Sequence, residues 1–140
     1  MSSFNPLKIW FYDECYLRFS AEDYNDSDLS NKYIHLTNNS ISKHSTKFTA
    51  NTIEGCMMHV NGLQDLLRQR CGREVWRSEI QPRIKEIVIF TLEAVKNQVG
   101  NRKSSFELLG YDFLIDTNNT PWLLEVNTSP AMDYSTVSAT

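Results

Sequence analysis

The sequence FELLGYDFLIDTNNTPWLLEVNTSP, residues 106–130, decides the fold that we expect for this chain. It reads as two apolar strands, residues 106–116 and 122–126, joined by the polar turn residues 117–120. Asp112 interrupts the apolar residues of the first strand and Glu125 those of the second, at points where a buried strand should have no acid. A buried carboxylate is costly unless it is paired or bound to a metal. The stretch therefore predicts a β-hairpin whose two acids need a partner.

The spacing of the two acids predicts that they face each other. If the turn pairs Asp116 with Pro121, Asp112 falls opposite Glu125, and the alternation of strand side chains puts Asn127 on the face of Glu125. Opposed carboxylates repel unless a cation lies between them, and an all-oxygen set suits Mg²⁺. Two interpretations are open at this point: a magnesium site, or an amphipathic hairpin whose acids lie in solvent.

Composition bounds the class of protein. A length of 140 residues fits one domain or one lobe of a larger domain, with 41% hydrophobic and 22% charged residues. The net charge of −3 gives no support for binding to nucleic acid, and no segment approaches the roughly 20 apolar residues of a membrane span. Three cysteines without a CxxC pair argue against a disulfide scaffold or a zinc site, and favour reduced thiols in the cytoplasm.

The N-terminal part predicts a second hairpin. Residues 7–12 and 15–19 are strand-like, and Asp13 and Glu14 would form the turn between them, although the usual glycine is missing. Arg18 lies inside the second of these strands. Its side chain either extends from the sheet edge into solvent, or it binds a phosphate or carboxylate through two parallel hydrogen bonds.

A polar cluster follows the acidic surface connection of residues 21–31. Within the segment YIHLTNNSISKH, residues 33–44, four neighbouring side chains are able to donate and accept hydrogen bonds: Thr37, Asn38, Asn39 and Ser40. Such a cluster is most often a loop or a helix cap. The alternative is a pocket that binds a nucleotide or a polar substrate.

The middle of the chain predicts helices. After an irregular loop over residues 45–61, a short helix spans residues 62–70 and ends at Gly72. A further helical stretch begins over residues 75–80, and a long amphipathic helix runs from Pro82 to Gly100. Six basic residues make this third of the chain either a solvated face or a surface for an acidic polymer: Arg68, Arg70, Arg73, Arg77, Arg83 and Lys85. The element order predicts an α+β fold, an antiparallel sheet with helices packed on one face.

Four motifs together resemble the tubulin–tyrosine-ligase-like enzymes, which are ATP-grasp ligases that add amino acids to tubulin. The motifs are YLRFS (16–20), IHLTNNSISKH (34–44), SFELLGYDFLID (105–116) and PWLLEVNTSP (121–130). Two segments look most similar to the tubulin glycylases: GREVWRSEIQPRIKEI (72–87) and NRKSSFELLGYDF (101–113). The glutamylases of the family share the main motifs. The resemblance implies that residues 1–140 form the C-terminal portion of an ATP-grasp-like domain.

The resemblance also implies roles for individual residues. It gives three ligands for Mg²⁺: Asp112, Glu125 and Asn127. Thr37 and Asn38 match positions that contact the nucleotide, and Asn39 and Ser40 match positions where related ligases contact the amino acid. Arg18 matches the arginine that serves the phosphate and the incoming amino acid, and is thus the expected catalytic residue.

The implied reaction joins glycine to tubulin. ATP phosphorylates a glutamate side chain in an acidic tubulin tail, and the amine of glycine attacks the resulting acylphosphate to form an isopeptide bond. The expected partners are ATP, Mg²⁺, microtubules and free glycine (or glutamate), for a monomer in the cytoplasm and on ciliary microtubules. The family's phosphate- and adenine-binding lysines precede the LRF motif, so we expect this chain alone to have little or no ligase activity. Two alternatives are a glutamylase and a non-catalytic fragment that binds tubulin.

Overall fold

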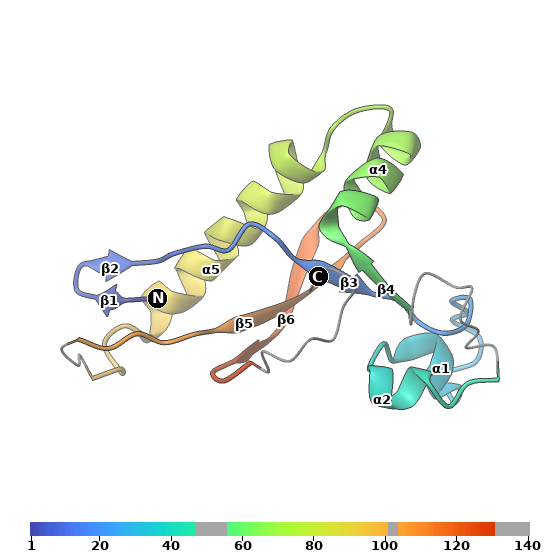
Figure 1. The fold of residues 1–140 in the computed structure, drawn as a ribbon, viewed down its shortest axis with the longest axis horizontal. Helices are drawn as coiled ribbons and strands as arrows, with labels where there is room; N and C mark the ends of the chain where they lie inside the picture. The colour runs from blue at the N-terminus through green and yellow to red at the C-terminus, as the bar shows by residue number, and fades with distance from the viewer. Residues whose placement is uncertain (47–55, 101–103, 131–140) are drawn as a thin grey trace. The chain divides into compact units, whose positions relative to one another are not determined.

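The chain is an α+β structure built from short antiparallel strand pairs and helices (Figure 1). A computed structural model describes residues 1–46, 56–100 and 104–130. These residues divide into two compact units, each described by itself. The hairpin unit contains residues 1–13 and residues 67–130, and the middle unit contains residues 14–66.

The predicted C-terminal hairpin is present in the hairpin unit. Strand β5 (Gly110–Ile115) pairs antiparallel with β6 (Pro121–Asn127), and the first expected strand begins at Gly110 instead of Phe106. Alternate residues of β5 differ in exposure, so that Tyr111, Phe113 and Ile115 are half-buried while Asp112 and Leu114 are exposed. The hairpin therefore has one face toward the core and one face toward solvent, as a strand period of two requires.

The predicted N-terminal hairpin is wrong. Strand β2 (Leu7–Lys8) pairs with β1 (Ser3–Phe4), whereas β3 (Tyr16–Arg18) pairs with the distant strand β4 (Met57–His59). A two-residue hairpin turn favours residues that adopt positive φ, and neither Asp13 nor Glu14 has a positive φ in the described backbone. The strand propensity of both segments was recognised, but the partner of each was not.

The helices of residues 60–95 follow the predicted pattern with shifted ends, and the first of them begins in the middle unit and ends in the hairpin unit. Helix α4 (Val60–Cys71) ends at Gly72, which has φ +68°, a conformation that glycine adopts without a Cβ penalty. A π-helical turn, η1 (Trp76–Ile80), leads directly into α5 (Gln81–Val95), which ends before the expected Gly100. Along α5, Ile84, Val88 and Leu92 are buried, so the predicted apolar stripe is core over most of the helix, whereas Val95 at its end is exposed. The helix meets the hairpin where Thr91 Oγ1 lies 3.0 Å from the Tyr111 hydroxyl.

The middle unit contains two short helices, α1 (Lys32–His35) and α2 (Asn39–Ser42), and the β3–β4 pair. Strand β4 and the start of α4 fall within the loop expected over residues 45–61; residues 47–55 of that loop lie outside the described residues. The expectation of a single antiparallel sheet is wrong for the described strands, which form three separate two-stranded sheets. Each described strand pairs with one neighbour. Most of the buried apolar side chains come from the helices instead.

Candidate functional site

The outer face of the β5–β6 hairpin brings the three expected magnesium ligands together. Asp112 lies opposite Glu125 in the strand register. Asn127, two residues further along β6, donates a hydrogen bond from Nδ2 to Glu125 Oε1 at 3.3 Å. Two carboxylates and one amide therefore share one patch, and all three residues are exposed. We call this surface the acid face.

The pairing of the two acids is as predicted, but the assumed turn register is wrong. At the turn, Pro121 pairs with Ile115 rather than with Asp116. Leu123 pairs with Phe113 and Glu125 with Asp112, so Leu124 has no partner in the ladder. An extra residue in one strand is a β-bulge, which bends the strand and redirects its side chains. The bulge compensates for the shifted turn and returns Glu125 to the position opposite Asp112.

The bulge also puts an apolar pair on the acid face. Leu114 pairs with Trp122 and shares the face of Asp112, because the two are two residues apart on one strand. Trp122 and Glu125 are three residues apart, a spacing that would put their side chains on opposite faces of a regular strand. Leu114 is 52% and Trp122 58% exposed. Asp112 and Glu125 are exposed as well, so neither acid bears the cost of burial, and their exposure agrees with the interpretation of an amphipathic hairpin whose acids lie in solvent.

The turn between the strands is held by Asp116, which the sequence reading assigned only to a strand end. Asp116 Oδ1 accepts the backbone N–H groups of Asn118 at 2.8 Å and Thr120 at 2.9 Å. Asp116 Oδ2 accepts the indole N–H of Trp122 at 3.0 Å. The indole hydrogen bond, followed by the one from Thr120, lowers the pKa of Asp116 below its ordinary value. An aspartate that opens a polar turn is a known signal, so this role could have been found from the sequence.

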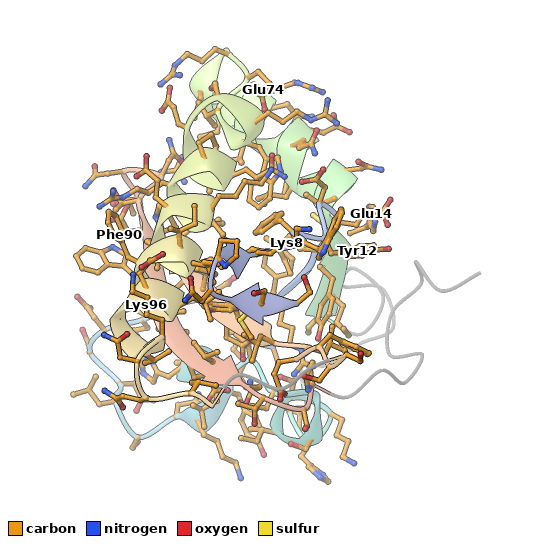
Figure 2. The ribbon with its side chains drawn as sticks, turned by 90° about the vertical axis from the view of Figure 1, so that its left-hand side faces the viewer. Lys8, Tyr12, Glu14, Glu74, Phe90 and Lys96 are labelled. Carbon is orange, nitrogen blue, oxygen red and sulfur yellow. The ribbon has the colours of Figure 1, made fainter. Side chains whose placement is uncertain are left out.

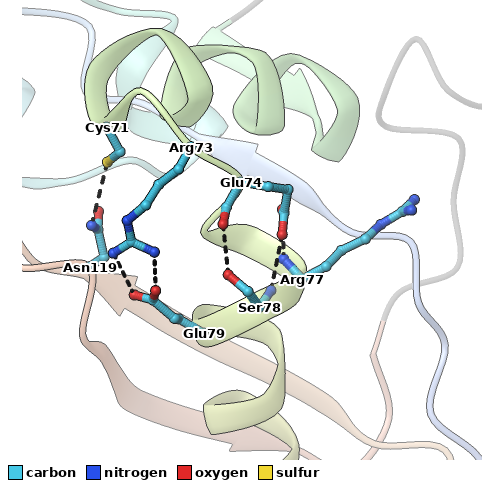
Figure 3. A network of polar contacts seen from close by, with 7 residues as sticks. All are labelled: Cys71, Arg73, Glu74, Arg77, Ser78, Glu79 and Asn119. Carbon is cyan, nitrogen blue, oxygen red and sulfur yellow. Dashed lines mark hydrogen bonds and ion pairs between the residues drawn. The ribbon is translucent and has the colours of Figure 1, made fainter.

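The end of α4 supports the same turn. Arg70 Nη2 donates to the carbonyl oxygen of Thr117 at 2.8 Å. Asn119, which has φ +64°, donates from Nδ2 to the Cys71 sulfur at 3.6 Å, a contact drawn in Figure 3. The three cysteines of the chain are free thiols. Turn and helix end are therefore joined by side chains from both partners.

Much of the basic surface in the middle of the chain is already paired. Arg73 forms an ion pair with Glu79 beside η1 (Figure 3), which raises the pKa of Arg73 and lowers the pKa of Glu79. Glu74 accepts the backbone N–H groups of Arg77 and Ser78. Further pairs join Arg83 to Glu86 and Lys85 to Asp13. These contacts reduce the positive charge that remains for an acidic partner.

Side chains on the outer side of α5 are largely exposed. Figure 2 shows Phe90 and Lys96 projecting from this helix. Phe90 is 67% exposed, and Lys96 forms an ion pair with Glu93. We do not include this side of α5 in the candidate site.

Arg18 lies in the middle unit, on β3 opposite Met57. Its Nη2 donates to the Tyr16 hydroxyl at 3.3 Å, and its guanidinium carbon lies 5.5 Å from the centre of the Tyr16 ring. A guanidinium over an aromatic face is restrained by a cation–π contact. The exposed Arg18 head is thus oriented by Tyr16.

The polar cluster joins the two short helices of the middle unit. Thr37, Asn38 and Ser40 are exposed, and the side chain of Asn39 lies outside the described part of the chain. The Asn38 carbonyl accepts the N–H groups of Ile41 and Ser42, each at 2.9 Å. The interpretation as a loop that leads into a helix is confirmed for the backbone, and contacts to a nucleotide or amino acid stay predictions.

Glu22 connects the segments that flank this cluster. Its Oε2 accepts a hydrogen bond from Asn31 Nδ2 at 3.2 Å, and its Oε1 accepts one from the Ser45 hydroxyl at 2.9 Å. Asn31 is also the N-cap of α1, where its side chain accepts the N–H of Tyr33. The sequence reading assigned residues 21–31 to a surface connection and missed this role of Glu22.

The acid face offers two carboxylates and one amide as possible metal ligands. Among the described residues, no three His, Cys, Asp or Glu side chains converge on a point where a metal would bind. The acid face therefore depends on the Asn127 amide for its third oxygen.

Within the described residues, no helix is long and apolar enough to cross a membrane.

Comparison with known proteins identifies the family. The profile described as "Tubulin-tyrosine ligase family" matches residues 1–139. The chain belongs to the tubulin-tyrosine ligase family. Tubulin glycylase 3D of Tetrahymena thermophila is 45% identical over 138 residues, and tubulin glycylase 3B of the same organism is 43% identical over 136 residues. The human tubulin monoglycylase TTLL3 is 37% identical over 146 residues.

The similarity covers nearly all of this chain but a small part of each relative. The alignments include 97% of the chain, and 13%, 12% and 18% of glycylase 3D, glycylase 3B and human TTLL3 respectively. The family assignment is therefore firm for these residues. The activity of a whole protein of this family requires a separate argument.

Proposed function

We propose that this chain carries the metal-binding part of a ligase that joins glycine to tubulin through ATP-dependent chemistry. The single observation that carries the proposal is the acid face, where Asp112 opposes Glu125 and Asn127 bonds to Glu125. The names of the relatives, which are tubulin glycylases, support the choice of substrate and amino acid. Such a protein would act on microtubules.

The chemistry of the donors fits Mg²⁺. All three side chains offer oxygen, and two carry negative charge, which suits a hard cation completed by water and phosphate oxygens. Directly opposed carboxylates gain when a cation lies between them. The exposure of Asp112, Glu125 and Asn127 leaves room for a nucleotide phosphate. When bound, Mg²⁺ would offset charge on the phosphate oxygens of ATP.

Arg18 is the proposed catalytic residue of the middle unit. Its guanidinium, oriented by Tyr16, would bind the phosphoryl group that passes to a glutamate side chain of tubulin, and offset its charge. The neutral amine of glycine then attacks the acylphosphate carbon, the C–O bond to phosphate breaks and inorganic phosphate leaves. The nitrogen loses a proton to solvent as the isopeptide bond forms. Thr37 and Asn38 would contact the nucleotide, with Asn39 and Ser40 near the amino acid.

Metal binding is the direct test. Titration of the 140-residue chain with Mn²⁺, followed by the electron paramagnetic resonance of the free ion, measures the site without turnover. We expect Asp112→Asn and Glu125→Gln each to weaken Mn²⁺ binding by at least about tenfold, the effect that even outer partners of metal ligands have. Asp23→Asn, which removes an exposed acid of the middle unit, is the matched control. Equal Mn²⁺ affinity in all four proteins would rule out the acid face as the metal site.

The amino acid is tested by competition. Labelled glycine and labelled glutamate are offered together, with ATP and microtubules, to the product of the full gene. Preferential transfer of glycine supports the glycylase, and transfer of glutamate would reassign the protein to glutamylation. Salt-sensitive binding to microtubules without use of ATP would instead indicate a non-catalytic tubulin-binding protein.

A further inference from the structure

The order of side chains on the acid face depends on the register at the turn. An unbroken ladder from the Ile115–Pro121 pair would put Asp112 opposite Leu124. An unbroken ladder from an Asp116–Pro121 pair would keep Asp112 opposite Glu125 but turn Trp122 to the inner face. Only the observed combination of the Ile115–Pro121 pair with a bulge at Leu124 puts Trp122 and Glu125 on one face.

Asp116 is the residue that holds this combination together. Its carboxylate accepts hydrogen bonds from two backbone N–H groups of the turn, those of Asn118 and Thr120. Its own N–H donates to the Thr120 carbonyl at 3.0 Å. These bonds keep Asp116 inside the turn and exclude it from pairing with Pro121.

The third bond of the carboxylate reaches past the turn into β6. Trp122 donates its indole N–H to Asp116 Oδ2 at 3.0 Å. Trp122 lies between the turn and the unpaired Leu124, directly opposite Leu114. The indole therefore cannot rotate to the inner face without losing this bond to a charged acceptor, a class of hydrogen bond stronger than its neutral equivalent.

We propose that Asp116 is a positioning residue, which holds the shifted turn and the indole of Trp122 so that the bulge forms at Leu124 and the acid face keeps its order. The effect of Asp116 on the strand register is argued from the turn alone. The importance of that register for catalysis rests on the metal site proposed above. The Asp116 carboxylate bonds to the turn and to Trp122, so we expect its effect on the candidate ligands to pass through the strand.

Backbone nuclear Overhauser effects in the isotope-labelled 140-residue chain, without metal, measure the register directly. We expect cross-strand signals between Leu114 and Trp122 and between Asp112 and Glu125. In Asp116→Ala, the Leu114–Trp122 signal should weaken about tenfold, as the loss of several hydrogen bonds from one turn allows. A signal from Leu114 to Leu123, the partner of Leu114 in a ladder that begins at an Asp116–Pro121 pair, should replace it, while the signal between Asp112 and Glu125 stays. The indole N–H of Trp122 should exchange with solvent about tenfold faster.

Asp28→Ala is the matched control. Asp28 is also an aspartate that closes a turn, accepting from the N–H and the hydroxyl of Ser30, but it lies in the middle unit. The substitution Asp28→Ala removes the same charge as Asp116→Ala and should leave the hairpin signals unchanged. If Asp116→Ala does not fold, Trp122→Phe removes the indole donor while keeping an aromatic ring, and is scored by the same signals. Unchanged register in the variant that folds would overturn the proposal.

The two proposals fail in different ways. If Asp116→Ala shifts the register and Mn²⁺ does not bind the parent chain, the positioning role stands and the metal site is wrong. If Mn²⁺ binds the parent and the register of Asp116→Ala is unchanged, the metal site stands and the positioning role is wrong. If both hold, Mn²⁺ binds the parent chain, and Asp116→Ala shifts the register of the turn half of the hairpin whereas Asp28→Ala does not.

Discussion

The two strand pairs that carry the candidate residues are built differently. In β5–β6, a turn of residues 116–120 joins the strands, and Asp116 closes it with bonds to its own neighbours. In β3–β4, Tyr16 pairs with His59 and Arg18 with Met57, so the residues that meet are far apart in the chain. Closing a longer loop costs more conformational entropy. The hairpin is thus specified locally, and the β3–β4 pair depends on packing around it.

This difference separates the two halves of the proposed chemistry. The candidate metal ligands stand on the locally specified hairpin. Arg18 stands on the strand pair that other parts of the middle unit must hold in place. Damage to the core of the middle unit should therefore displace Arg18 and leave the acid face intact.

The largest effect is expected at Met57, which lies opposite Arg18 and is 8% exposed. Met57→Ala should lower the free energy of unfolding by about 2–5 kcal/mol, the range for truncating a buried methionine. Denaturant unfolding measures the loss. Native-state hydrogen exchange locates it: we expect faster exchange in β3 and β4, and unchanged exchange at the Asp116 N–H.

Met58→Ala is the control, because the neighbouring methionine is only half-buried. Its truncation removes less buried surface and should therefore cost less than that of Met57. Equal loss of protection in the two strand pairs of Met57→Ala would contradict the separation drawn here.

A smaller effect tests the support of the hairpin turn by α4. Gly72 has φ +68°, and any other residue there bears a penalty of about 1–2 kcal/mol. Gly72→Ala should destabilise the chain by this amount and speed exchange of the turn amides, because Arg70 and Cys71 contact the turn. Gly100→Ala is the control, since a Cβ there meets nothing within 4 Å and its φ is not positive. Similar melting temperatures for the two variants would show that the α4 end is not strained.

The sequence predicted the hairpin and the opposition of Asp112 to Glu125 because both depend on neighbouring residues. Alternation of apolar residues and a polar turn are local signals. The bulge at Leu124 was not predicted. The turn pairing is shifted by one residue and the bulge adds one residue, so Asp112 lies opposite Glu125 with or without the two changes, and the spacing of the acids does not reveal them. The sequence left open whether the acids lie in solvent, since their exposure depends on which face of the hairpin packs on the core.

The partners of β2 and β3 were beyond sequence reasoning for a different reason. Their apolar patterns predict strands, but a pattern does not name the strand that pairs with it. Strand β4 contains only Met57–His59 and adjoins a helix, so its own signal is weak. The role of Glu22 was missed because it joins Asn31 and Ser45 across the middle unit, whereas the role of Asp116 needs only the turn that follows it.

The smallest expected effect is the response of the hairpin to acid. The hydrogen bond from the Trp122 indole, with those from the turn amides, lowers the pKa of Asp116 below its ordinary value near 3.8. A carboxyl whose pKa is lower in the folded chain contributes stability above its unfolded pKa, and this contribution is lost as the pH falls through the folded value. The protection of the turn amides against exchange, relative to the intrinsic rate at each pH, should therefore fall below about pH 4, where an unfolded aspartate begins to bind its proton.

Asp116→Asn separates this response from acid effects elsewhere. Asp28 also has a lowered pKa, chiefly through its hydrogen bond with the Ser30 hydroxyl, so the middle unit should respond to acid as well. The Trp122 indole resonance in the parent chain should move with the protonation of Asp116, with a midpoint below the ordinary aspartate value. In Asp116→Asn the indole should no longer follow pH in this range, while the Ser30 amide still does. An indole shift that persists in Asp116→Asn would mean that another acid controls the turn, and the local specification of the hairpin would then need a second residue.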